Sequence, residues 1–275
     1  MRLVDTYLGR TGDVPVVFLK IGFIHYITMI FIIMLDKPLL SMRSSYYTAI
    51  MVLSLTSLMA QSEIHIMIVT GGHSFERESF FGMFEQFEGV TYQELVQPKA
   101  NQQIENGLVD DFDLLLFYDM YDSITSRQKD AYLRLVRQKK PMLFLHHSLV
   151  SYQDWPEFTQ IIGGKYHTKD SSQLSYYQHD DTIQVKVSPV SHPVIEGLHD
   201  FTIIDETYGN CEILPSVVPL LETDHPRSLP VIGWVNSYLG HKMVYLQGGH
   251  GPSAFKDPNF LKVLDQAIRW SVNHR

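Results

Sequence analysis

The sequence has 275 residues, of which 45% are hydrophobic and 19% charged, and its formal net charge is −8 at pH 7. A chain of this size and composition is typical of one globular domain with additional N-terminal sequence. Because phosphate-backbone binding depends on clustered Lys and Arg, and 22 basic residues are outnumbered here by 30 acidic ones, the composition argues against a nucleic-acid partner.

The N-terminal residues contain two apolar stretches. Residues 42–60 have the layout of a secretory signal peptide, with Arg43, an apolar run over 46–59, and Ala60 before Gln61. This layout predicts an exported protein, periplasmic or extracellular. Upstream, residues 14–35 are long enough to span a bilayer. Three interpretations of residues 1–41 stay open: a gene-model extension before a true start at Met42, a membrane anchor through residues 14–35, or an amphipathic helix packed on the domain.

The signal-peptide interpretation makes a direct prediction. Expression from Met42 in a bacterial host should yield a soluble product that begins at Gln61 or close to it, because the small residue Ala60 marks the cleavage site. N-terminal sequencing checks the result. A full-length product retained in the membrane would contradict it.

From Ile64 onward, short β-rich runs alternate with helix-patterned segments, as in a parallel sheet with crossover helices. The predicted strands cover 64–70, 113–119, 141–145, 183–187 and 242–247, and the predicted helices 75–87, 126–138, 154–164 and 258–273. In the third helix we expect Asp154 as the N-cap, Pro156 in the first turn and Gly163 near the C-cap. Residues 165–230 are less regular.

Polar residues follow the predicted strands where each strand ends. They are His73, Asp119, His146, His147 and His250. Since ligands of open parallel sheets bind at the carboxyl edge, these side chains are expected to share a pocket. The competing interpretation, that each histidine only hydrogen-bonds its own loop, stays open.

Four segments carry a family resemblance. They are "VTGGH" (69–73), "LHHSLVSYQDWPEFTQIIGGKY" (145–166), "SHPVIEGLHDFTIIDETYG" (191–209) and "GGHGPSAF" (248–255). Together they resemble the ThuA-like, or trehalose-utilisation, family over about 64–273. The resemblance implies a ThuA-like domain at 62–275 with the class I glutamine amidotransferase-like fold, a flavodoxin-like three-layer α/β sandwich whose central sheet is mostly parallel. It also implies carbohydrate catabolism, notably of 3-keto derivatives of glycosides, with a small carbohydrate as partner.

The strand-to-helix elbow lacks a cysteine. Amidotransferases of this fold place a nucleophilic cysteine there, whereas this chain has "FLHHSL", and its single cysteine, Cys211, lies in "YGNCEIL". Ser148 lacks the flanking glycines of a serine nucleophile elbow. One cysteine also forms no intrachain disulfide, so it leaves the compartment open. Glutamine amidotransfer, cysteine-peptidase and serine-hydrolase chemistry are therefore not expected.

Histidine and carboxylate chemistry remains, and it suggests a set of site residues. We expect catalytic roles for His73, His146, His147 and Glu206. Glu206 is preferred to Asp205 because successive strand residues face opposite sides. One divalent metal such as zinc is expected on His73, His146 and His250. The expected substrate-binding residues are Asp119, Tyr152, Trp155, Tyr208 and His250. For His167 and His179, a role as further ligands stays open, and the interpretation as surface residues is preferred.

The adjacent histidines cannot both face one side of a regular strand. By alignment with the elbow of related folds, His146 is expected to rise over the sheet edge into the pocket. His147 is the nearest rival for that role and is otherwise expected to support the loop from below.

These residues favour an enzyme, a hydrolase or lyase acting on a glycoside or its 3-keto form. A non-catalytic sugar-binding protein that uses the same cleft is the alternative, and an inactive scaffold is a third interpretation. A homo-oligomer is compatible with the sequence.

Overall fold

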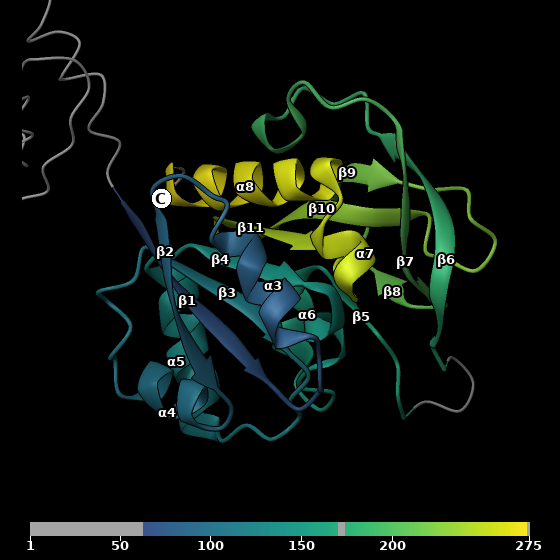
Figure 1. Cartoon of the computed structure of the whole chain (residues 1–275). Helices are drawn as coiled ribbons and strands as arrows, with labels where there is room; N and C mark the ends of the chain where they lie inside the picture. Colours follow the sequence, from purple (N-terminus) through teal and green to yellow (C-terminus); the bar gives the residue numbers. More distant parts are fainter. Residues whose placement is uncertain (1–62, 170–173, 274–275) are drawn as a thin grey trace, which may run out of the picture. The chain divides into compact units, whose positions relative to one another are not determined.

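A computed structural model describes residues 63–169 and 174–273 (Figure 1). The expectations for residues 1–41, for the apolar stretch 14–35 and for the signal peptide at 42–60 lie outside the described residues. Within the described ranges, every helix is too short or too polar to cross a bilayer.

Strands and helices alternate as expected over residues 64–162, after which most of the strands follow one another directly. The strands are β1 Ile64–Gly71, β2 Val90–Val96, β3 Leu114–Asp119, β4 Met142–Leu145, β5 Gly164–Lys165, β6 Tyr176–Val187, β7 Phe201–Gly209, β8 Glu212–Ile213, β9 Val218–Glu222, β10 Val231–Tyr238 and β11 His241–Leu246. The helices are α3 Arg77–Phe84, α4 Lys99–Glu105, α5 Ser126–Arg137, η2 His146–Val150, α6 Pro156–Ile162, η3 Pro193–Ile195, α7 Pro252–Phe255 and α8 Pro258–Asn273.

Nine of the described strands form one sheet, in the order β2-β1-β3-β4-β11-β10-β9-β6-β7. The first five strands of this order run parallel. The last four pair antiparallel, from β10 against β11 outward to β7 at the edge. The sheet therefore joins a parallel block to an antiparallel extension.

Alternation along the parallel strands divides their side chains between two cores. In β3, Leu114 and Leu116 join a core with α3, α7 and α8, whereas Leu115 and Phe117 join a second core with α4, α5 and α6. All four side chains are fully buried, because helices cover both faces of the parallel block (Figure 1). This arrangement confirms the predicted flavodoxin-like three-layer sandwich.

Local signals explain the helix ends. Thr125 caps α5 with a reciprocal pair of hydrogen bonds to Gln128, and Gly163 ends α6 in the left-handed conformation, at a φ of 89°. The expectation for Asp154 is wrong. The N-cap of α6 is Trp155, without a side-chain cap, because the Asp154 carboxylate pairs instead with Lys169 at 2.8 Å.

Candidate functional site

The chain turns sharply at His146, directly after the central strand β4. His146 has a φ of 49°, a left-handed conformation that is costly for residues with a Cβ and that histidine adopts more often than most. The 3₁₀ helix η2 begins at the same residue. This turn matches the expected elbow, and it carries the His146 ring beyond the carboxyl edge of the sheet.

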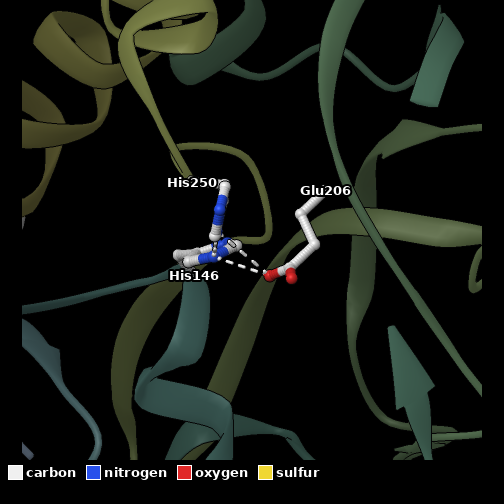
Figure 2. A group of neighbouring side chains, drawn as sticks. All are labelled: His146, Glu206 and His250. Carbon is white, nitrogen blue, oxygen red and sulfur yellow. Dashed lines mark hydrogen bonds and ion pairs between the residues drawn. The ribbon is translucent and has the colours of Figure 1, made fainter. Parts of the chain in front are cut away.

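The His146 ring meets two other ligand-type side chains. Its Nε2 lies 3.0 Å from Glu206 Oε2 and 3.2 Å from His250 Nδ1, and the last two atoms are 3.3 Å apart. Figure 2 shows the three side chains pointing toward one another from β4–η2, β7 and the loop after β11. We call His146, Glu206 and His250 the His–Glu–His cluster.

The cluster has the geometry and donors of a zinc site. His146 Nδ1–H donates to the carbonyl of Gln247 at 2.7 Å, so Nε2 is the ring nitrogen that faces the other two groups and that would ligate a metal once it carries no proton. Tetrahedral zinc with ligands at about 2.0–2.1 Å separates them by about 3.3 Å, close to the three distances found. In the described part of the chain, these three residues form a group of His and Glu side chains whose ligand atoms all lie within 4.8 Å of one another, close enough to hold one metal ion.

The cluster shifts the pKa values of Glu206 and His250 in opposite directions. Burial alone would raise the pKa of the Glu206 carboxyl, but hydrogen bonds from His146 and His250, with their positive charge when protonated, outweigh burial and hold the pKa far below its usual range. The hydrogen bond to Glu206 raises the pKa of His250. Glu206 is therefore an anion at neutral pH, the state required of a metal ligand.

The Asp205 carboxylate fixes the loop that carries His250. It accepts hydrogen bonds from the backbone N–H groups of Gly249 at 2.7 Å, His250 at 2.9 Å and Glu206 at 2.8 Å. Its side chain points away from the Glu206 carboxylate, as strand alternation predicts. The close approach explains the glycine at position 248, where a Cβ would lie 3.1 Å from Asp205 Oδ2.

Replacing this carboxylate should loosen both the loop and the cluster. Asp205→Asn should lower the free energy of unfolding by about 2–3 kcal/mol. The NH₂ group of asparagine would replace a carboxylate oxygen that accepts hydrogen bonds from backbone N–H groups, and an NH₂ group cannot accept them. Urea unfolding measures the loss, and Asp130→Asn, an exposed change on α5, is the matched control. Equal stability of the two variants would contradict the role given to Asp205.

His147 and His73 lie together beside the cluster. Their ring centroids are 4.9 Å apart, and His147 Nε2–H donates to the Tyr118 carbonyl at 3.1 Å. Burial is the main reason why the pKa of each is lowered, most strongly for His147. His73 is more exposed, at the end of "GGH", where Gly72 has a φ of 83° and a Cβ would collide with the Met120 carbonyl. His73, expected as a metal ligand, thus stands next to His147 rather than within the cluster.

His179, which we interpreted as a surface residue, contacts the cluster. Its Nδ1 lies 3.1 Å from Glu206 Oε1 although 48% of its side chain is exposed. The pairing of β6 with β7 shifts register between Gln178 and Asp181, and such a bulge re-aims side chains. No motif in the sequence marks this position, because the bulge depends on how two strands pair.

A cavity of about 300 Å³ opens beside the cluster. We call it the site cavity. It is lined by His73, Met120, His146, His147, Val150, Tyr166, Thr168, Tyr177, His179, Glu206 and Tyr208. The Tyr208 hydroxyl is 3.1 Å from His146 Nε2. Sequence reasoning identified His73, His146, His147, Glu206 and Tyr208, but it missed Tyr166, Tyr177 and His179.

The structure places three expected substrate-binding residues elsewhere. Asp119, Tyr152 and Trp155 are 1–3% exposed and do not line the site cavity. Asp119 Oδ2 accepts a hydrogen bond from Gln97 Nε2 at 2.9 Å, and the same amide lies 3.1 Å from the Tyr152 hydroxyl. These groups form a polar cluster inside the α4–α5 side of the sandwich, and Trp155 packs in the core there.

Comparison with known proteins places this site in a family. Solved structures with a similar fold include ThuA-like proteins from Parabacteroides merdae (14% identity over 77% of this chain and 90% of that chain, TM-score 0.62) and Bacteroides uniformis (18%, 76% and 91%, 0.56). A glutamine amidotransferase from Thermotoga maritima has a TM-score of 0.45 at 11% identity over 77% and 99% of the two chains. No curated protein sequence matches significantly.

At such identities, structural likeness establishes only the fold, and the family follows from the sequence itself. The ThuA family, described as "Trehalose utilisation", matches residues 66–271. That range contains the elbow, all three cluster residues and every residue lining the site cavity. The chain therefore belongs to the ThuA family, whose description suggests a carbohydrate-related function.

Proposed function

We propose that this protein is an exported enzyme that cleaves glycosides in their 3-keto form, with the His–Glu–His cluster as its centre. One observation carries the proposal: three side chains of metal-ligand type have their ligand atoms within 4.8 Å of one another, and two of them line a cavity that tyrosines also line. Tyrosine rings offer an apolar face to a sugar ring and a hydroxyl for hydrogen bonding. Family membership makes a small carbohydrate the natural substrate class.

The cluster residues suit one divalent ion such as zinc, whose Lewis acidity would polarise the C3 ketone when it is bound. The protein's own residues account for the proton. His73 is neutral near pH 7, because burial lowers its pKa, and it reaches the site cavity, so it is the base that takes the C2 proton. The C2–H electron pair then forms the C1=C2 bond, and the C1–O bond breaks with its electrons leaving on oxygen, which takes a proton from water.

Turnover tests the proposal. The purified protein is incubated with 3-keto-trehalose, with zinc or with a chelator, and monosaccharide release is followed by chromatography. Release that depends on zinc and is lost in His73→Gln is expected. Exchange of the C2 hydrogen with solvent deuterium should accompany it. Tight sugar binding without release would contradict the enzymatic proposal and support a non-catalytic sugar-binding protein instead.

A further inference from the structure

A second cavity adjoins the cluster from the other side. Its volume is about 320 Å³, against about 300 Å³ for the site cavity. Of these two cavities, His179 lines both, Glu206 lines the site cavity and His250 lines the second one. Because Glu206 Oε2 and His250 Nδ1 are 3.3 Å apart, the cluster forms the wall between the two spaces. A bond held at the cluster therefore has room for a chemical group on each side.

The two cavities differ in character. Tyr166, Tyr177 and Met120 give the site cavity apolar walls. The polar side chains that line the second cavity include Glu76 before α3, Asp180 in β6, Asp205 in β7 and Ser253 in α7. The β6 bulge that aims His179 at Glu206 also sets Asp180, at a φ of 56°. Hydroxyl donors of a ligand would find carboxylate acceptors here.

We infer that the second cavity is the subsite for the leaving half of the glycoside and that it selects a neutral, polyhydroxylated group. No Lys or Arg is among the residues that line it; its acidic side chains are Glu76, Asp180 and Asp205, and its imidazoles are those of His179 and His250. A phosphate or carboxylate on the leaving half would face like charge at close range, which costs affinity. The inference rests on the proposed function, since it assumes a glycoside whose 3-keto ring occupies the site cavity.

Calorimetry with three probes tests the subsite without turnover. Methyl α-D-glucopyranoside fills only one cavity, trehalose can fill both, and trehalose 6-phosphate adds an anion. In the wild type, trehalose should bind about tenfold more tightly than the methyl glucoside, as expected from one or two additional hydrogen bonds. Trehalose 6-phosphate should lose that gain. Glu76→Gln combined with Asp180→Asn should remove the gain for trehalose, restore binding of the phosphate, and leave the methyl glucoside unaffected.

The substitutions preserve shape, and asparagine tolerates the positive φ at position 180. Glu78→Gln, an exposed change on α3 outside the cavity, is the matched control and should change nothing. Equal affinity for trehalose and the methyl glucoside, or tight binding of trehalose 6-phosphate to the wild type, would overturn the subsite alone. If the binding pattern holds but 3-keto-trehalose is not cleaved, the subsite stands and the proposed chemistry fails. If none of the three sugars binds, the subsite fails, and cleavage of 3-keto-trehalose decides the proposed chemistry separately.

Discussion

Glu206→Gln should weaken zinc binding roughly 100-fold or more, since it removes the one anionic ligand and leaves two neutral imidazoles. The Glu206 carboxylate touches three imidazoles, those of His146, His250 and His179. Glutamine keeps the size of the side chain, but its carbonyl oxygen is uncharged and its NH₂ group cannot ligate a metal. Release of monosaccharide from 3-keto-trehalose should fall by about three orders of magnitude, as for groups that stabilise developing charge.

Isothermal titration with zinc and the turnover assay measure these two effects. Glu212→Gln is the matched control, because Glu212 also lies near a histidine, 3.7 Å from His167, but away from the cluster. The control should retain wild-type zinc affinity. Because the folded protein holds the pKa of Glu206 far below its usual range, the anion stabilises the fold, and its neutral replacement should lower the melting temperature. Undiminished zinc binding in Glu206→Gln would rule out the His–Glu–His cluster as the metal site.

Asp119→Asn should change how stability depends on pH. Burial raises the pKa of the Asp119 carboxyl from 3.8 to about 7. Between these values the folded protein keeps a proton that the unfolded chain has released. The free energy of unfolding of the wild type should therefore fall as pH rises from about 4 to about 7 and level off above. A neutral asparagine removes this contribution, and it should stabilise the protein at pH 8 by up to about 4 kcal/mol.

Urea unfolding of both proteins at a series of pH values measures this difference. The two stabilities should agree near pH 4 and diverge toward pH 8. Asp130→Asn, an exposed change on α5, should follow the wild-type curve. Parallel curves for Asp119→Asn and the wild type would mean that the buried carboxyl does not hold a proton in the fold.

The central strands and the long helices could be predicted because their signals are local. Residues 64–71 and 114–119 are apolar runs buried on both faces, and α5 has a capping box and an apolar face. β2 was missed, since "VTYQELV" pairs only with β1 at the sheet edge and stays half polar. The short helix α4 and the strand β10 were missed with it, because their sequences carry no clear period or cap.

The positions of the candidate site residues could be predicted where the strand-end rule applies, but not where side-chain parity or strand pairing decides them. His146 and His250 follow β4 and β11, and the structure brings them together. Asp119 also ends a strand, but by strand alternation its side chain lies on the same face as Leu115 and Phe117. That face belongs to the core with α4, α5 and α6, away from the His–Glu–His cluster. His179 depends on a bulge, which cannot be predicted from one strand alone.

The attachment of the β6–β7 hairpin has a consequence for local unfolding. β7 is the last strand of the sheet, and β6 pairs with β9 only at Lys186 and Val187. Farther along the hairpin, Glu206 and His179 reach across to His146 and His250. A ligand that binds at the cluster therefore fastens the outermost strands to the centre of the sheet. The bound ligand should slow hydrogen exchange at the β6–β7 amides more than at those of β1. Occupation of the site would thereby suppress local unfolding of the sheet edge.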